Sequence, residues 1–345
     1  MRRLLMAEPE LLLTHYAIHD RIASGGMGSI HLARVVGSVG FARTVVVKRL
    51  RRIYADDPDF VSSFVDEARL VARIRHPNVV APLDVVAERG ELFLVLEYVH
   101  GEVASRLLKT MIARNERIPT PVAISIGVGA LLGLHAAHDA KDERGAPLRI
   151  VHRDVSPHNV IVGADGHARV IDFGIAKAVG RLRSTRRGSD QIKGKLAYMA
   201  PEQVLGDPVD HRADVYAASI VLWELLCGRR LSDAPGVDGL VERVAGAPVD
   251  PPSKHNRELS RQLDDIVLRG LQRDPNARWP TARAMAFAIE QATTPATASQ
   301  VGAWVTRLAS TSLAELAAKI AAIESDAMND RLSSVLEEIR ATRED

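Results

Sequence analysis

The hydrophobic pattern of the sequence changes near Gly101, and this change limits the folds that are open to the chain. Before it, the runs IHLARVV, RTVVVKRL and ELFLVLEYV are rich in β-branched residues and typical of strands. Between the second and third runs, DFVSSFVDEARLVARI has apolar residues at helical spacing. After Gly101 the pattern is mainly helical, with short strand-like runs. We therefore expect an α+β protein with a β-rich unit over 16–99, containing one main helix, and a helical unit over 100–291.

The chain beyond residue 291 has a different composition. ATTPATASQ, residues 292–300, is typical of a linker, and 301–345 is expected to form a helical tail. Ser312 and Glu315 have the spacing of a capping box. One helical face of the tail is apolar: Leu313, Leu316, Ile320 and Ile323. Because this face must be buried, we expect the tail to pack on the helical unit or on a partner.

The uncharged stretch from Ile118 to His138 is the best candidate for a membrane span. It contains three glycines, two prolines and two histidines, and only its middle is strongly apolar. A span needs about 20 mainly apolar residues, so a buried core helix is the better interpretation. In the N-terminal extension, 1–15, Glu8 and Pro9 interrupt the apolar run, which disfavours a signal peptide. We predict no membrane span.

Charge and cysteine content exclude several classes of protein. Lys and Arg total 45 against 43 Asp and Glu, which gives no general reason to expect nucleic-acid or membrane binding. The single cysteine, Cys227, excludes an internal disulfide framework and a zinc site with several thiolates. A reducing cytoplasm fits this composition best.

Two stretches in the second unit contain aspartates that could take part in phosphate chemistry. HRDVSPHN, residues 152–159, supplies Asp154, which suits the acceptance of a hydroxyl proton, and Asn159, whose amide oxygen suits a hard cation. DFG, residues 172–174, ends an apolar run with Asp172 at a strand end. The alternatives are a polar turn, with His152 packed in the core, and a chance Asp-Phe-Gly turn.

The first unit contains the matching phosphate-binding features. The glycines of IASGGMGSI, residues 22–30, let backbone amides approach phosphate oxygens. Lys48 ends an apolar strand, and Glu67 in the next helix is the natural carboxylate to hold it. Each has a simpler interpretation: glycine-rich hairpins are common, the lysine could reach solvent, and the glutamate could lie on a solvated helix face.

Three further residues complete the set. APE, residues 200–202, supplies Glu202, and ADVYA supplies Asp214. Arg278 in DPNARWP could pair with Glu202 or lie on the surface.

The order and spacing of these stretches resemble the signature set of protein kinases. From about Tyr16 to Gln291 the chain is similar to bacterial members of the eukaryotic-like (Hanks-type) serine/threonine protein kinase family. The resemblance implies the bilobal kinase fold, with a β-rich N-lobe over 16–99 and a helical C-lobe over 100–291. It also implies ATP in the cleft, with Mg²⁺ as the metal and Mn²⁺ as the alternative.

The resemblance also implies residue roles. Lys48 would hold the α- and β-phosphates, Glu67 would hold Lys48, and Asp154 would be the catalytic base. Asn159 and Asp172 would be the metal ligands. The residues implied to contact the nucleotide are Ile22, Ala23, Ser24, Gly25, Gly26, Met27, Gly28, Ser29 and Ile30, with Lys48 and the backbone of Glu97 and Val99. Leu96 would guard the back of the adenine pocket.

The implied activity is transfer of the γ-phosphate of Mg-ATP to Ser or Thr hydroxyls of proteins. The segment from Lys177 to Lys195, with both ends included, contains seven basic residues and one acidic residue. A phosphate there could order the segment, with Arg153 as its expected partner. The candidate acceptors are Ser184, Thr185 and Ser189. The alternative is a basic solvated loop that binds acidic substrates.

The sequence departs from the family pattern at four positions. Ala23 replaces the first glycine of the loop, which is tolerable where φ is negative, and Val46 replaces an alanine. Ser156 stands where the family has a lysine, and Lys195 where it has a threonine. Our hypothesis is that these two exchange roles, so that Lys195 supplies the ammonium and Ser156 the hydroxyl beside Asp154.

Two other functions are open to such a chain. A pseudokinase would act as a nucleotide-binding or scaffolding module, but such proteins commonly lack at least one catalytic residue, and none is missing here. A small-molecule kinase is disfavoured by the APE segment with Asp214 and Arg278, which resembles a platform for polypeptides.

Overall fold

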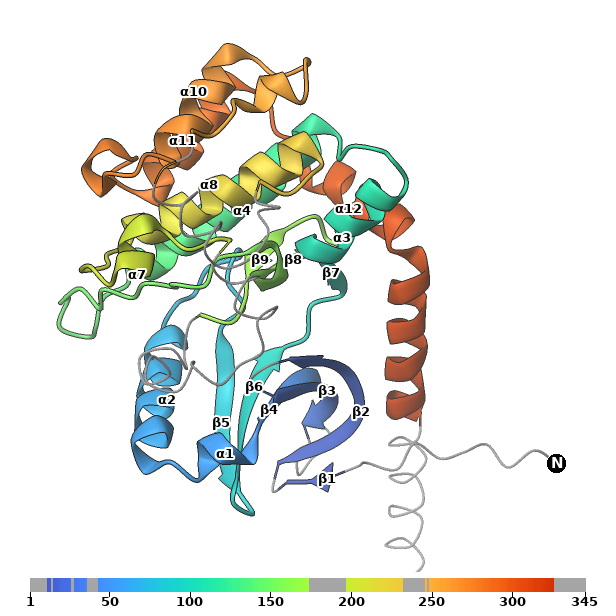
Figure 1. Ribbon diagram of the computed structural model, residues 1–345. Helices are drawn as coiled ribbons and strands as arrows, with labels where there is room; N and C mark the ends of the chain where they lie inside the picture. The colour runs from blue at the N-terminus through green and yellow to red at the C-terminus, as the bar shows by residue number, and fades with distance from the viewer. Residues whose placement is uncertain are drawn as a thin grey trace, which may run out of the picture. The chain divides into compact units, whose positions relative to one another are not determined.

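The computed structural model describes residues 11–13, 15–25, 28–35, 43–173, 197–231, 246 and 248–325 (Figure 1). The chain forms two compact units. The first contains Met1–Val61, Pro82–Tyr98 and Thr311–Asp345, and the second contains Ser62–Ala81 and Val99–Ser310. Residues 62–81, expected in the β-rich unit, therefore group with the helical unit. These residues are hydrogen-bonded to the strand-forming residues 168–170 of that unit. Val80 N donates to Val170 O over 3.0 Å, and Asn78 Nδ2 donates to Ala168 O over 2.7 Å.

The first unit is built on a six-stranded sheet in which every neighbouring pair is antiparallel. Its order is β1 (Leu11–Leu12), β2 (Tyr16–Gly25), β3 (Gly28–Val35), β4 (Thr44–Leu50), β6 (Glu91–Glu97) and β5 (Pro82–Glu88). A short helix, α1 (Arg52–Ala55), follows β4. The three runs predicted as strands from their β-branched residues are β3, β4 and β6, as expected.

One face of this sheet carries an apolar core. Successive side chains of a strand point to opposite faces, so β4 places Val45 and Val47 on one face and Lys48 on the other. The buried members of the core are Leu13, Tyr16, Ile18, Ala33, Val45, Val47, Phe93 and Val95.

Helix α2 (Pro58–Val71) is the main helix predicted between the strand-like runs. Asp57 caps its start, because its Oδ1 accepts the backbone N–H groups of residues 59 and 60 at 3.2 Å each. The apolar positions predicted from helical spacing are all buried: Phe60, Phe64, Ala68, Val71 and Ile74.

The second unit combines a small sheet with a bundle of helices. The strands are β7 (Gly101–Val103), β8 (Val160–Gly163) and β9 (Ala168–Val170). The α-helices are α3 (Ala104–Ala113), α4 (Thr120–His138), α7 (Pro201–Leu205), α8 (Arg212–Cys227), α10 (Arg261–Gly270), α11 (Ala282–Ala292) and α12 (Ala298–Leu308). Short 3₁₀ helices are η1 (Pro157–Asn159), η3 (Pro252–Lys254) and η4 (Pro275–Ala277).

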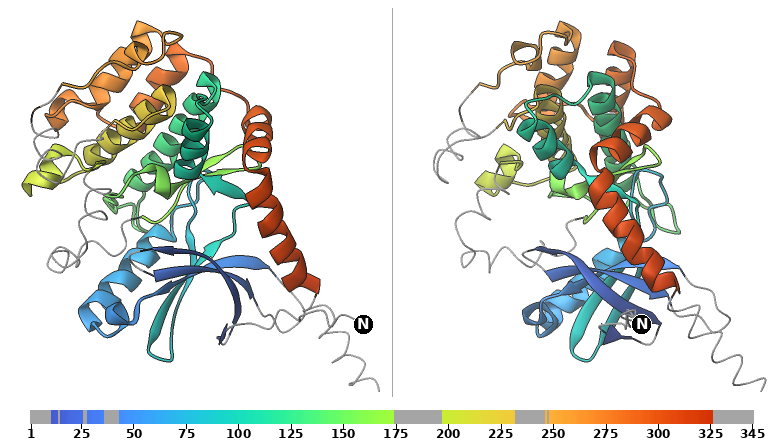
Figure 2. Two further views of the ribbon diagram at one scale, coloured as in Figure 1. Left: turned by 45° about the vertical axis from the view of Figure 1, so that its right-hand side comes forward. Right: turned by 90° about the vertical axis from the view of Figure 1, so that its right-hand side faces the viewer.

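Helices α4 and α8 form the centre of this unit. They run side by side (Figure 2), and α4 also contacts α11 and β9. Within the described part of the chain, α4 is long and apolar enough to cross a membrane by length and composition, but 67% of its apolar window is buried. This burial agrees with the prediction of a core helix.

Helix α12 begins inside the range predicted as a linker. Thr297 caps it, with Gln300 N donating to Thr297 Oγ1 over 3.3 Å and Thr297 N donating to Gln300 Oε1 over 2.9 Å. Its buried residues include Val301, Trp304 and Val305, and it contacts α3, α4, β7 and β8. The approach is close, because a Cβ on Gly302 would lie 2.2 Å from the carbonyl oxygen of Ala164.

Residues 310–325 form a further helix. This helix begins directly after Ala309, the residue that caps the end of α12. Ser312 therefore lies inside the helix, and the capping box predicted at Ser312 does not mark its first residue. Residues 311–325 belong to the first unit. The predicted apolar face is covered, with Leu313 and Ile323 each 4% exposed and Leu316 and Ile320 half-buried.

Candidate active site

The predicted site residues fall into two groups, one in each unit. In the first unit, strand pairing places three of them in a row across β2, β3 and β4: Ala23 pairs with Ile30, and Ile30 pairs with Lys48. Directly paired residues of an antiparallel sheet share a face, so these three side chains lie on the same face. Ala23 is not among the residues with positive φ, so the methyl group that replaces the family's glycine meets the expected condition.

The same register places other predicted residues. Val46 and Leu96 are paired on the face of Lys48. Ser29 pairs with Arg49, so its side chain lies on the opposite face, and only its backbone could serve a nucleotide on the Lys48 side. Glu97 forms an exposed 2.8 Å ion pair with Arg43. Gly26 and Met27 lie outside the described residues.

Gly28 is required by the close approach of β3 and β4. A Cβ at this position would lie 1.9 Å from the carbonyl oxygen of Arg49, closer than any contact between real atoms of this kind. Gly25 pairs with Gly28 across the hairpin, yet a Cβ there would meet nothing within 4 Å.

These two glycines provide a matched pair of variants. Gly28→Ala is expected to force β3 away from β4 and to lower the free energy of unfolding by about 1–3 kcal/mol. Gly25→Ala should change it by less than about 0.5 kcal/mol, because its methyl group enters open space. Urea unfolding followed by circular dichroism measures both. Equal losses in the two variants would contradict the steric argument.

In the second unit, a buried carboxylate holds the segment that carries Asp154. Asp214, 1% exposed, accepts the backbone N–H of His152 at 2.7 Å and that of Arg153 at 2.8 Å. Its Oδ2 also forms a 2.8 Å hydrogen bond with Nε2 of His138. Burial alone would raise the pKa of Asp214, but the hydrogen bond with His138 and the backbone N–H of His152 hold the pKa below its ordinary value. The carboxylate therefore stays ionised and fixes the loop.

His152 contributes a second constraint on the loop. Its Nε2 lies 3.0 Å from the carbonyl oxygen of Ile171, which can only accept, so Nε2 carries the hydrogen. Nδ1 then accepts the backbone N–H of Asp154 at 3.2 Å. The ring is fully buried and packs against Phe173 with centroids 4.7 Å apart. The alternative that His152 is a core residue is thus correct, and from the core it orients Asp154.

Asn159 and Asp172 fit the role of hard-cation ligands. The amide nitrogen of Asn159 donates to the backbone carbonyl of Asp154 over 2.7 Å, which leaves the amide oxygen as the group that can coordinate a metal. Asp172 has a φ of +57°, a conformation that costs free energy outside glycine and clusters at functional sites. Mg²⁺ is usually held by one or two protein oxygens together with phosphates and water, and this pair matches that requirement.

Glu67 and Arg153 interact electrostatically in the second unit. Burial raises the pKa of Glu67, and the Arg153 guanidinium opposes this shift. Arg153 has a φ of +61°, and its carbonyl oxygen accepts Nε2 of Gln203 at 3.2 Å. Ser156 is buried, and its carbonyl oxygen accepts the backbone N–H of Asn159 at 2.9 Å.

Arg278 and Glu202 form the ion pair that the sequence left as one of two alternatives. Nη1 and Nη2 of Arg278 each lie 2.7 Å from a different carboxylate oxygen of Glu202. The arginine is 1% exposed. Its remaining donors reach the backbone carbonyls of Gln272, Arg212 and Arg273 at 2.7–3.0 Å. The pair ties the APE segment to the region after α10.

Lys195, Ser184, Thr185 and Ser189 lie outside the described residues. The exchange of roles between Lys195 and Ser156 therefore stays a prediction. The sequence assigned no role to His138. It also did not indicate that Asp214 holds the loop that carries Asp154. The one available signal was the position of Asp214 at the start of a strongly apolar helix, where a carboxylate must find partners.

Comparison with known proteins decides the family. A family model described as the protein kinase domain matches residues 16–288. The chain belongs to the protein kinase family. Over 275 residues it is 39% identical to the tyrosine-protein kinase MasK of Myxococcus xanthus, covering 80% of this chain and 42% of that protein. Over 286 residues it is 35% identical to the serine/threonine-protein kinase PknB of Mycobacterium leprae, covering 81% of this chain and 43% of that protein.

Solved structures support the same fold. The chain is 25% identical to the kinase domain of Mycobacterium tuberculosis PknI, with a TM-score of 0.61, over 82% of this chain and 98% of that one. The protein kinase fold, with a β-sheet N-lobe and a helical C-lobe, is therefore the fold of this kinase domain. The chain spans about two fifths of the length of the curated relatives that it matches.

Proposed function

We propose that the chain is an active, ATP-dependent serine/threonine protein kinase. The observation that carries this proposal is the fixed arrangement around Asp154. Asp214 accepts the N–H groups of the two preceding residues, His152 accepts that of Asp154 itself, and Asn159 donates to the carbonyl oxygen of Asp154. A scaffold without chemistry has no need of a general base and a metal ligand joined in this way.

The proposed mechanism uses this chain's own groups. Asp154 accepts the proton of the attacking hydroxyl and orients it. Asn159 and Asp172 would hold Mg²⁺, which would supply positive charge against the phosphates of the nucleotide, and Lys48 would neutralise the α- and β-phosphates. Phosphoryl transfer depends mainly on alignment and charge stabilisation, so these roles are sufficient.

Serine/threonine specificity is the finer part of the proposal. Similarity to the serine/threonine-protein kinase PknB supports it, whereas similarity to the tyrosine-protein kinase MasK favours tyrosine as the acceptor. Autophosphorylation at Ser184, Thr185 or Ser189 is part of the same proposal. A cytoplasmic location rests on the single, buried Cys227.

We also propose that 16–291 is the catalytic domain and that the tail packs on its own chain rather than on a partner. The burial of Val301, Trp304 and Val305 in α12 supports this, as does the ion pair between Lys319 and Asp20.

The test is a transfer assay with γ-labelled ATP, the full chain and a mixture of protein acceptors. We expect transfer that requires Mg²⁺ or Mn²⁺ and gives phosphoserine and phosphothreonine on acid hydrolysis. ATP binding without transfer would instead establish a pseudokinase. Phosphotyrosine alone would overturn the specificity.

A further inference from the structure

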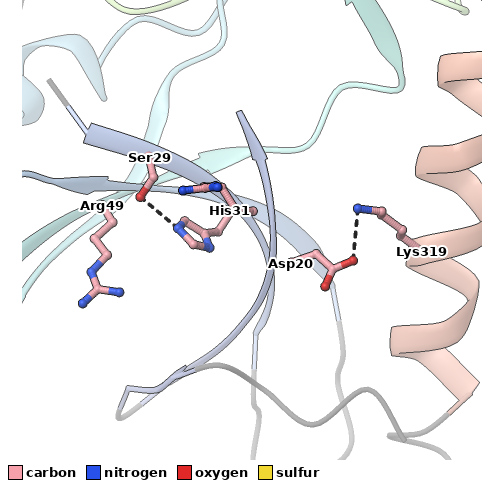
Figure 3. Close-up of a pocket in the computed structure, with 6 residues that line it drawn as sticks. Asp20, Ser29, His31, Arg49 and Lys319 are labelled. Atoms are coloured by element: carbon pink, nitrogen blue, oxygen red, sulfur yellow. Dashed lines mark hydrogen bonds and ion pairs between the residues drawn. The ribbon is translucent and has the colours of Figure 1, made fainter. Parts of the chain in front are cut away.

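A polar hollow opens on the first unit, away from the face that carries Lys48. Its volume is about 480 Å³. The lining residues are Asp20, Arg21, Ser29, His31, Arg49 and Lys319 (Figure 3). Strand register separates it from the side chains of Ile30 and Lys48: Ser29 and Arg49 pair on one face, while Ile30 and Lys48 pair on the other. Of the predicted nucleotide residues, Ser29 lines the hollow with its side chain and has only its backbone available to the Lys48 side.

The hollow lies where the sheet's apolar core ends. Along β4 the same face carries Val45, Val47 and then Arg49, and along β3 it carries Ala33, His31 and then Ser29. Apolar packing therefore gives way to cationic and hydrogen-bonding side chains towards the glycine-rich hairpin.

The floor of the hollow is held in a fixed conformation. His31 is 4% exposed, and its Nδ1 lies 3.1 Å from the carbonyl oxygen of His19, which can only accept. Nδ1 therefore carries a hydrogen, and Nε2 bonds Ser29 Oγ over 2.9 Å (Figure 3).

The two arginines of the hollow differ in whether an acidic side chain neutralises them. Arg49 forms a 2.8 Å bond from Nη2 to Glu91, which occupies one of the five N–H donors of its guanidinium. Among the described residues Arg21 has no ion-pair partner, and its side chain is exposed. Two guanidinium groups with unused donors thus face a space with one carboxylate, that of Asp20.

The tail helix neutralises that carboxylate. Lys319 Nζ lies 3.1 Å from Asp20 Oδ2, and the same helix reaches β4 through Thr44 and Glu324, 3.4 Å apart. Without Lys319, Asp20 would repel an anion from the hollow. With it, the unbalanced charge is that of Arg21.

We propose that this hollow binds a phosphate monoester, with Arg21 and Arg49 as its direct donors and Lys319 as the residue that makes the site compatible with an anion. Arginine suits phosphate because its planar fork donates two parallel hydrogen bonds. The phosphate monoester is either a phosphorylated side chain or a small phosphorylated metabolite. By linkage, its binding strengthens the attachment of the tail helix to β2. The site does not depend on catalytic activity.

The test is a titration of the full chain, labelled with ¹³C at its histidines, with three probes. These are inorganic phosphate, O-phospho-L-serine and a peptide of residues 181–191 phosphorylated at Thr185. We expect the His31 ring signal to shift on titration. The tightest probe identifies the source: the peptide if the ligand is a phosphorylated side chain, a small probe if it is a metabolite.

Matched variants locate the binding. Arg21→Gln should weaken it about tenfold, which corresponds to the loss of one charge-assisted contact. Lys319→Gln should weaken it by about as much, because the carboxylate of Asp20 is then no longer neutralised and repels the anion. Arg43→Gln, which removes an arginine of the same unit outside the hollow, should not. Lys48→Met should keep the binding, because Lys48 lies on the opposite face. The proposal is overturned if no probe shifts the His31 signal, or if Lys48→Met abolishes binding while Arg21→Gln does not.

Discussion

Asp154→Asn is expected to lower the rate of phosphoryl transfer by about 10²–10⁴-fold, the usual contribution of a general base. Two hydrogen bonds of residue 154, to His152 Nδ1 and from Asn159 Nδ2, use its main chain and survive the substitution. The loop should therefore keep its conformation, and the affinity for Mg-ATP should stay near that of the wild type. Transfer from labelled ATP and nucleotide titration by calorimetry give the two quantities.

The control is Asp265→Asn, which makes the same chemical change at an exposed position in α10. It should retain wild-type transfer. A wild-type rate in Asp154→Asn would show that another group accepts the proton. A large loss of nucleotide affinity would show that Asp154 acts in binding instead.

The sequence predicted those features that depend on local periodicity. Phe60, Phe64 and Ala68 recur at helical spacing, and all three are buried in α2. The stretch that became α4 is apolar on every side, and such a helix belongs in a core. The roles of Asp154, Asn159 and Asp172 could also be predicted, because each of these residues stands in a short contiguous motif.

The features that could not be predicted involve residues far apart in the chain. Asp214 bonds backbone groups about 60 residues earlier, and no local pattern encodes that distance. In β2, register shifts on either side of Arg21 break the two-residue alternation, so the faces of β2 could not be assigned by counting. The ion pair between Lys319 and Asp20 joins the two ends of the chain and is visible only in the fold.

Arg278→Met is expected to lower the free energy of unfolding by about 3–5 kcal/mol, the cost of leaving one partner of a buried ion pair alone. Glu202 is 7% exposed and would lose both short bonds, and three backbone carbonyls would each lose the N–H that Arg278 donates. A loss of this size should lower the melting temperature by roughly 10 °C. Arg73→Met is the control, because its pair with Glu143 is exposed and should contribute less than about 1 kcal/mol.

A double-mutant cycle separates the ion pair from the packing of the arginine. Glu202→Gln removes the charge that Arg278→Met leaves unpaired, so the double variant should lose less stability than the sum of the two single losses. Its remaining deficit measures the loss of the hydrogen bonds that the guanidinium donates to the backbone carbonyls at residues 212, 272 and 273. Additive losses would mean that the carboxylate is stabilised without Arg278, and that the arginine acts mainly through those carbonyls. In that case the APE segment would be held to the rest of the second unit by main-chain contacts and not by charge.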